Sequence, residues 1–421
     1  MCKPLGRVDF LIPGRGPWSS GSTSVSIRPC FDVAVNLPRG VCWFGEASSP
    51  RLSMKAHVAD LLSRAGARVK RKLVAGLGLT TVSLLALEAT ARVRTPRLSR
   101  DVTGDPALIH RAGPILCRSN GPRDRVSIAV VEAGGVQKAH FGADDLTQYE
   151  VGSVTKTMTA ALFADMVDRD DVDVRMLLGE IFDLGDSEIA GVSLEELATH
   201  TSGLPAMVNT ARNLLGLALW PVLVHDPSAS TTVGSLCTDA QRVALGPKEY
   251  TYSNLGYSLL GQALARCAGT DYSTLLQKRL FLPMGMANSF VPPNTAALPE
   301  DAPRGYSVMW GRRAEPWTLG AEAPSGGVRS TLSDMIRYVR AHLDGAAPGI
   351  RAMEPVREIG EGLGVGYGWH IEHGSMAWHN GMTGGFASWV SVDRERGRGI
   401  VVLSNTMNSV DELGRALAGC S

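Results

Sequence analysis

Strand-forming segments at the two ends of residues 92–421 constrain the fold of this chain most. Residues 125–132 (RVSIAVVE) are apolar and β-branched, a Gly-Gly turn follows, and residues 136–142 can return as a second strand. Residues 386–392 and 400–404 repeat this pattern, whereas the chain between the two hairpins is mainly helical in pattern. Because strands from both ends need partners, we expect an α/β (α+β) fold with one antiparallel sheet flanked by helices. The middle, roughly residues 155–325, would form a second, mostly helical lobe.

Length and charge agree with a two-lobed body behind a leader. The 421 residues exceed the about 250–300 at which a single core stops growing. Hydrophobic residues at 44% and charged residues at 20% are ordinary for a globular protein. Residues 1–91 carry 12 Lys and Arg against 5 Asp and Glu. Residues 92–421 therefore carry 30 Lys and Arg against 36 Asp and Glu and are mildly acidic. A mildly acidic body lacks the basic face of a nucleic-acid-binding protein, so we expect no nucleic-acid partner.

The first 91 residues divide into two segments. Residues 1–53 are rich in Gly, Pro, Ser and Arg without periodicity, which predicts a disordered or non-native leader with Met54 as the natural start. Residues 54–91 contain a basic cluster at 68–72, an apolar run at 73–87 and Ala-Thr-Ala at 89–91, the layout of a secretory signal peptide. A membrane anchor through 73–91 is the alternative, although fifteen apolar residues fall short of the about 20 that span a bilayer. We therefore expect an exported protein of the cell envelope, periplasm or extracellular space, with cleavage and anchoring both open.

Cysteine and glycine patterns predict no bound cofactor. The body contains Cys117, Cys237, Cys267 and Cys420, which allow three pairings and show no C-x-x-C spacing. Alternating glycines at 360–368 resemble a phosphate-binding loop, but no Lys-Ser or Lys-Thr follows them, so a flexible loop is expected. We expect neither a metal nor an organic cofactor.

Ser153 and Lys156 form an S-x-x-K pattern that can supply a nucleophile and its base. Val154, Met158, Leu162 and Met166 continue from them at four-residue steps, which predicts a helix beginning at Ser153. At this spacing both side chains project from one side of the helix. A lysine held in a dry pocket has a lowered pKa and can take the serine proton. An N-cap serine beside a solvated lysine is the alternative for the isolated motif.

Tyr252 and Asn254 form a second polar element immediately before a helical pattern that starts at Leu255. In an extended segment residues two apart point to the same side. A phenol can relay protons, and an amide can both donate and accept hydrogen bonds. The alternative is a tyrosine packed on the helix, with Asn254 as the helix N-cap.

A third element, His379-Asn380-Gly381-Met382, completes a family resemblance. S-x-x-K, Y-x-N and K/H-x-G in this order resemble the serine β-lactamase-related family, in the branch of class C β-lactamases, D-alanyl-D-alanine carboxypeptidases and esterases. The segments THTSGLP (199–205), YSNLGYSLLG (252–261) and GGVRST (326–331) support the resemblance, which covers nearly the whole body. It implies a β-lactamase/transpeptidase-like fold with the active site between the two lobes. It also implies that His200, in the first of these segments, lies in a structural turn.

The resemblance implies a role for each residue of the three motifs. Ser153 would be the acylated nucleophile, Lys156 and Tyr252 its proton-handling partners, and the identity of the base stays open. Asn254, His379, Asn380 and Gly381 would bind substrate, and the backbone N–H groups of Ser153 and Met382 would form the oxyanion hole. The implied reaction is hydrolysis of β-lactams or D-Ala-D-Ala peptides. The alternatives are an esterase for small acyl esters and a slow penicillin-binding or regulatory protein.

Histidine at position 379 separates this chain from β-lactamases of the branch, which usually carry lysine there. Histidine, with a reference pKa near 6.5, is mostly neutral at pH 7 and offers no permanent cation to a substrate carboxylate. Hydrogen bonds to charged groups contribute about 1.5–3 kcal/mol, so carboxylate-bearing substrates would bind roughly tenfold or more weakly.

The substitution His379→Lys tests this interpretation. It should increase the turnover of carboxylate-bearing β-lactams, because lysine restores a cation for the substrate carboxylate. Turnover of a chromogenic cephalosporin by the purified variant and wild type measures the effect. An unchanged or lower rate would contradict the interpretation.

Overall fold

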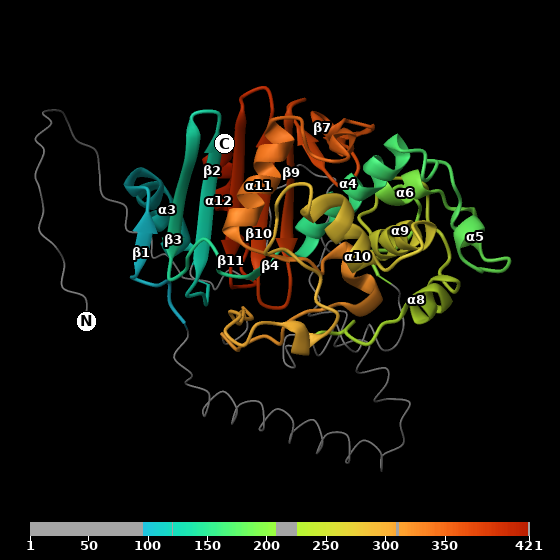
Figure 1. Ribbon diagram of the computed structural model, residues 1–421, viewed down its shortest axis with the longest axis horizontal. Coiled ribbons are helices and arrows are strands. Elements are labelled where there is room, and N and C mark those ends of the chain that lie inside the picture. Colours follow the sequence, from blue (N-terminus) through green and yellow to red (C-terminus); the bar gives the residue numbers. More distant parts are fainter. Residues whose placement is uncertain (1–95, 120, 208–224, 309–310, 420–421) are drawn as a thin grey trace, which may run out of the picture. The chain divides into compact units, whose positions relative to one another are not determined.

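The first and last strands of the body lie in one antiparallel sheet. The computed structural model describes residues 96–119, 121–207, 225–308 and 311–419, so the predicted leader and signal segments lie outside it. In the described part the sheet has nine strands in the order β1-β3-β2-β11-β10-β9-β8-β7-β6 (Figure 1). The strands are β1 (Val102–Gly104), β2 (Val126–Glu132), β3 (Gly135–Phe141), β6 (Arg357–Gly360), β7 (Leu363–Val365), β8 (His370–Glu372), β9 (Met376–Met382), β10 (Ala387–Asp393) and β11 (Arg398–Ser404).

The pairing of β2 with β11 joins the two predicted hairpins. Val126 lies opposite Ser404 and Val130 lies opposite Ile400 in this antiparallel pair. Strand β2 is buried along nearly its whole length, because helices cover both faces of the sheet. The expected sheet with strands from both ends is confirmed, and the observed strand ends differ from the predicted ones by at most about two residues.

Residues 360–365 of the glycine-rich segment at 360–368 belong to a β-hairpin at the sheet edge, so the expectation of a loop was wrong for this part. Strands β6 and β7 pair antiparallel on either side of a short turn, and Gly362 in that turn has φ +71°. The ladder between the strands uses backbone groups, which glycine supplies as well as any other residue. The alternating glycines therefore concealed a β-hairpin.

Helices cover the two faces of the sheet (Figure 1). On one face α11 (Leu332–Leu343) packs on β10, β11 and β2 with buried residues at three- and four-residue spacing. On the other face lie α3 (Pro106–Arg118) and α12 (Asp411–Ala418), and a side chain at Gly414 of α12 would collide with Trp389 of β10. The sheet is therefore the middle layer of three.

The remaining helices pack around two central helices, α4 (Thr155–Asp168) and α9 (Asn254–Cys267). Every residue from Thr155 to Met166 is buried, so α4 is covered on all sides and not only along the predicted stripe. Its neighbours include α9 and α10 together with short 3₁₀ turns. The helices and turns of this part are α5 (Leu178–Ile181), α6 (Leu194–Ala198), α8 (Val233–Ala240), α9 (Asn254–Cys267), α10 (Tyr272–Leu276), η1 (Gly152–Val154), η2 (Glu188–Gly191), η3 (Gln277–Phe281), η4 (Thr295–Ala297), η5 (Gly320–Ser325) and η6 (Ile350–Met353).

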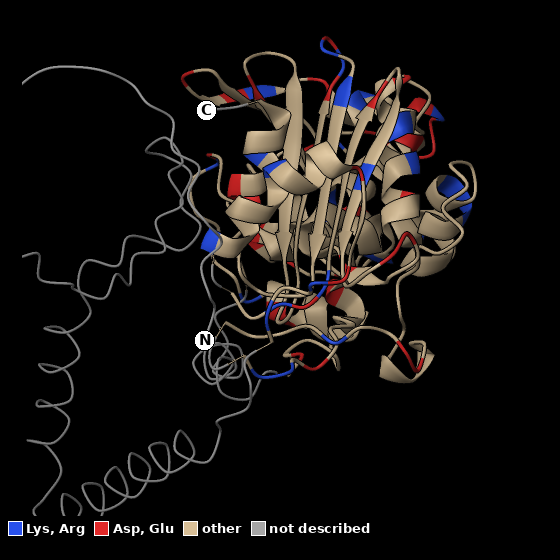
Figure 2. Ribbon diagram, turned by 90° about the vertical axis from the view of Figure 1, so that its left-hand side faces the viewer, with Lys and Arg blue, Asp and Glu red and all other residues tan. Residues whose placement is uncertain are grey.

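The surface of the body carries both signs of charge. Lys and Arg positions are interspersed with Asp and Glu positions on the side shown in Figure 2. Within the described ranges no helix has both the length and the apolar character that crossing a membrane requires. The apolar run at 73–87 lies outside those ranges.

Candidate active site

The chain enters the site through a short two-stranded sheet that leads directly to Ser153. Strand β4 (Tyr149–Glu150) pairs with β5 (Arg329–Ser330), and the N–H of Val151 continues the pairing by donating to the carbonyl of Val328. The 3₁₀ turn η1 then carries Ser153, and α4 begins only at Thr155. The expectation that the helix begins at Ser153 was therefore wrong by one short turn, which the left-handed conformation of Gly152 (φ +52°) introduces.

The hydroxyl of Ser153 lies between a phenol and an amine. Tyr252 Oη donates a hydrogen bond to Ser153 Oγ over 2.7 Å, and Lys156 Nζ lies 3.2 Å from the same oxygen. Ser153 is 6% exposed, whereas Lys156 is fully buried. The structure thus brings together the serine, lysine and tyrosine that the sequence motifs single out.

Lys156 has only neutral oxygens as recorded hydrogen-bond partners within the described residues. Its Nζ donates to Asn254 Oδ1 over 2.7 Å and to the carbonyl of Ser325 over 2.6 Å, and Ser153 Oγ is the third partner. Burial without a carboxylate partner penalises the charged form, so the pKa of Lys156 lies well below the usual lysine value. Burial raises the pKa of the Tyr252 phenol, so Tyr252 stays protonated at neutral pH.

The side chains of Tyr252 and Asn254 both point toward Ser153 and Lys156, as the spacing of the two residues predicts. Ser253, between them, is the N-cap of α9, because its hydroxyl accepts the N–H of Gly256 over 2.9 Å. The alternative in which Asn254 caps this helix is wrong. Asn254 is the first helical residue, and its side chain remains available to Lys156.

The end of β9 lies against the turn that carries Ser153. A Cβ placed on Gly381 would lie 2.0 Å from the carbonyl oxygen of Val151, and a Cβ on Gly152 would lie 2.6 Å from the backbone nitrogen of Met382. Ser388 of β10 donates its hydroxyl to the same Val151 carbonyl over 2.7 Å. Two glycines that face each other thus bring the backbone of Met382 close to that of Ser153.

His379 lies beside the tyrosine and is almost completely buried. It is 1% exposed, and its ring centroid lies 6.2 Å from that of Tyr252 and 5.4 Å from that of His370. Its Nδ1–H donates to the carbonyl of Asn380 over 2.5 Å. Burial, together with the neighbouring His370 and Lys156, lowers the pKa of His379 well below its usual value, so the ring is neutral at pH 7.

The side chain of Asn380 is engaged elsewhere. Its amide donates to Asp411 Oδ2 of α12 over 2.8 Å. Because successive residues of a strand point to opposite faces, Asn380 and His379 leave β9 on different sides. A substrate contact of Asn380 on the side of His379 therefore requires its backbone.

Two contacts near Ser153 have no signature in the sequence motifs. The Ser325 carbonyl that accepts from Lys156 is a backbone group, which any residue could provide. Ser388, which accounts for the fixed position of Val151, is one of several serines in apolar strands. Its only sequence signal is a polar residue in an otherwise buried strand.

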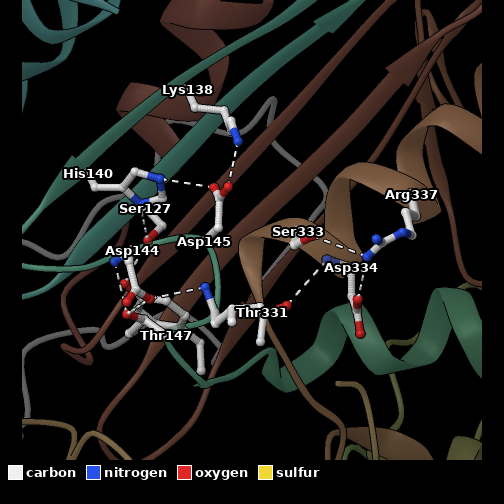
Figure 3. Close-up of polar contacts among 12 residues, drawn as sticks. Ser127, Lys138, His140, Asp144, Asp145, Thr147, Thr331, Ser333, Asp334 and Arg337 are labelled. Atoms are coloured by element: carbon white, nitrogen blue, oxygen red, sulfur yellow. Dashed lines mark hydrogen bonds and ion pairs between the residues drawn. The ribbon is translucent and has the colours of Figure 1, made fainter. Parts of the chain in front are cut away.

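A second row of serine, histidine and aspartate lies between β2, β3 and the loop that follows them (Figure 3). Ser127 Oγ lies 3.0 Å from His140 Nδ1, and His140 Nε2 lies 3.2 Å from Asp145 Oδ1. Ser127 is completely buried and also contacts the Tyr149 hydroxyl, so no substrate can reach it. This row holds the sheet to the strand that leads to Ser153.

Within the described ranges the cysteines form no disulfide, and potential metal ligands do not cluster. Cys117, Cys237 and Cys267 are free, and none of them is buried, while Cys420 lies outside the described residues. In the same ranges no three His, Cys, Asp or Glu side chains are placed to hold a metal ion.

The nine-stranded antiparallel sheet, with S-x-x-K, Y-x-N and H-x-G meeting at one point, defines a fold of the β-lactamase/transpeptidase-like class. The chain belongs to the Beta-lactamase family, whose model matches residues 120–418.

Curated relatives of several names match this chain at modest identity. It is 29% identical to penicillin-binding protein 4 of Amycolatopsis lactamdurans, over 48% of this chain and 52% of the relative. It is 31% identical to the D-alanyl-D-alanine-carboxypeptidase/endopeptidase AmpH of Escherichia coli (strain K12), over 46% of this chain and 48% of the relative. A β-lactamase of the same strain is 24% identical over 77% of this chain and 94% of the relative. The matched region spans about half the length of the first two relatives.

Substitution of Gly152 tests the contact between β9 and the turn that carries Ser153. In Gly152→Ala the new Cβ would meet the Met382 backbone in a left-handed conformation, which costs about 1–2 kcal/mol for a residue other than glycine. We expect the melting temperature to fall by several degrees and labelling of Ser153 by a fluorophosphonate to slow at least about tenfold, as typical for a disturbed oxyanion donor.

Gly134→Ala is the matched control, because a Cβ at Gly134 has no heavy atom within 4 Å. It should leave both measurements unchanged. Labelling of Gly152→Ala at the wild-type rate would show that the close approach is irrelevant to the site.

Proposed function

We propose that this chain is a serine hydrolase that forms an acyl-enzyme at Ser153 and acts on β-lactams or D-Ala-D-Ala type peptides. The observation that carries the proposal is the position of Ser153 Oγ, 2.7 Å from Tyr252 Oη and 3.2 Å from Lys156 Nζ. The names of the relatives, a penicillin-binding protein, a D-alanyl-D-alanine carboxypeptidase and a β-lactamase, support this substrate class.

The proposed base is Lys156 in its neutral form. A neutral amine has two hydrogens and one lone pair, and Asn254 Oδ1 and the Ser325 carbonyl are acceptors for the two hydrogens. The lone pair is then left for the hydroxyl hydrogen of Ser153, 3.2 Å away. Because burial lowers the pKa of Lys156 and raises that of Tyr252, the amine is the stronger candidate for the base.

In the proposed acylation Ser153 transfers its proton to Lys156 while Oγ attacks the acyl carbon. The negative charge that develops on the carbonyl oxygen is stabilised by the N–H groups of Ser153 and Met382. Tyr252, which is protonated and within hydrogen-bond distance of Oγ, donates a proton to the leaving group and regains one from Lys156. Water then hydrolyses the acyl-enzyme, with the same groups acting in reverse.

An esterase with the same nucleophile is the second candidate, and His379 favours it. Its ring is buried and its pKa is lowered, so it supplies no cation at neutral pH. A small acyl ester without a carboxylate does not need one. We also infer export, which rests on the signal-like layout of residues 54–91 in the sequence.

A substrate panel with wild type and Ser153→Ala tests the proposed function. A chromogenic cephalosporin, a D-Ala-D-Ala peptide and a p-nitrophenyl ester should separate the substrate classes, and Ser153→Ala should lose at least about 10³-fold in rate on whichever is turned over. Slow labelling without turnover would point to a penicillin-binding or regulatory protein. Retained labelling of Ser153→Ala would refute the assignment of the nucleophile.

The pH dependence of acylation identifies the base. If Lys156 must be neutral, the labelling rate should fall as the pH drops through an ionisation well below the ordinary lysine pKa, and should level off above it. Tyr252→Phe should slow labelling about 10²–10⁴-fold and keep this acid limb, because the phenol is not the titrating group. A rate that keeps climbing through pH 10 would instead indicate a phenolate base.

A further inference from the structure

His200 holds both residues that flank Tyr252 in the chain. Its backbone carbonyl accepts the N–H of Thr251 over 2.8 Å, and its ring atom Nδ1 accepts the N–H of Ser253 over 3.0 Å. One residue therefore fixes the peptide units on either side of the tyrosine. These two hydrogen bonds fix the backbone position from which the side chain of Tyr252 extends.

The ring of His200 also packs against the tyrosine ring. The two centroids lie 4.7 Å apart with an interplanar angle of 31°, and Tyr257 lies 4.8 Å away with an angle of 40°. His200 is 6% exposed, so neighbouring atoms leave its ring little freedom to move. The phenol of Tyr252 thus rests on a fixed surface, with its hydroxyl 2.7 Å from Ser153 Oγ.

The backbone of His200 is held in a conformation that side chains other than glycine rarely adopt. Its φ is +59°, in the left-handed region. Such a conformation persists only where the surrounding contacts impose it. The segment after His200 is fixed as well, because the carbonyl of Gly203 accepts the N–H of Gly246 and that of Ala206 accepts the N–H of Asn254.

The hydrogen bond from Ser253 also fixes the protonation state of the imidazole. Since Nδ1 accepts a backbone N–H, the ring proton of neutral His200 must be on Nε2. Burial lowers the pKa of His200 well below its usual value, and Lys156, His379 and His370 lower it further. The acceptor therefore stays available at neutral pH.

We propose that His200 is a positioning residue for Tyr252. It sets the position and the ring orientation of the phenol so that the phenol hydroxyl lies within hydrogen-bond distance of Ser153 Oγ. The proposal rests on acylation at Ser153 as the function of the site. His200 has no recorded contact with Ser153 or Lys156 through its own hydrogen bonds, so it acts through the tyrosine. A displacement of a reacting group by about 1 Å can cost about 10²-fold in rate, which sets the expected size of the effect.

Two substitutions separate the parts of this role. His200→Leu removes the acceptor for Ser253 and keeps an apolar side chain against Tyr252. His200→Asn keeps an acceptor oxygen near the position of Nδ1 and tolerates a positive φ, but it removes the ring. Each is made in the wild type and in Tyr252→Phe, and the rate of Ser153 labelling by a fluorophosphonate is measured together with the melting temperature.

His200→Leu should slow labelling of the wild type roughly 10- to 100-fold, and His200→Asn should lose less. In the Tyr252→Phe background neither substitution should change the rate more than about twofold, because residues that act as a unit are not additive. His342→Leu is the matched control, since His342 is also buried but packs in α11 against Tyr338 and Trp369. It should lower the melting temperature and leave the labelling rate of the folded protein unchanged.

The outcomes separate this proposal from the proposed function. If the wild type is labelled and both His200 variants are labelled at the same rate, the positioning role alone would be overturned. Equal losses in the wild-type and Tyr252→Phe backgrounds would do the same, since they would show a general structural effect. Wild type that is not labelled would overturn acylation at Ser153 and the positioning role with it. If His200→Leu does not fold, His200→Asn in the two backgrounds gives the same comparison.

Discussion

The buried amine of Lys156 is the constraint on which the rest of the site depends. It is fully buried, and the partners recorded for it are a hydroxyl, an amide oxygen and a backbone carbonyl. An ammonium ion in such a place pays a desolvation cost that no neighbouring carboxylate offsets within the described part of the chain. The residues around it are arranged so that the neutral amine satisfies all of its hydrogen-bonding capacity.

Three separate parts of the fold converge to keep that arrangement. The central helix α4 carries Lys156, the start of α9 supplies Asn254, and the turn η5 supplies the Ser325 carbonyl. The sheet contributes from the opposite side, where β9 and β10 fix the turn that holds Ser153. A change in α9 or η5 therefore reaches Ser153 through Lys156, and a change in β10 reaches it through the hydrogen bond from Ser388 to the Val151 carbonyl.

Strand patterns at both ends of the body were sufficient to predict the antiparallel sheet, whereas the three motifs pointed to a site only through the family resemblance that their joint order carries. The hairpin at 125–142 and the Y-x-N element are local patterns, and the structure brings them to the expected places. The sequence could not reveal that Ser253 rather than Asn254 caps α9, since both residue types are good N-caps. Nor could it reveal the backbone contacts of Ser325 and His200, which arise from long-range packing.

The hydrogen bond from Ser388 to the carbonyl of Val151 joins residues 237 positions apart in the chain. The turn that carries Ser153 is thus completed by the last third of the sequence, and β2 finds its inner neighbour only in the final strand, β11. Contacts of such long range form late and slow the folding of a chain. A nascent chain that has not yet released β10 and β11 from the ribosome therefore has its serine, lysine and tyrosine but no assembled site.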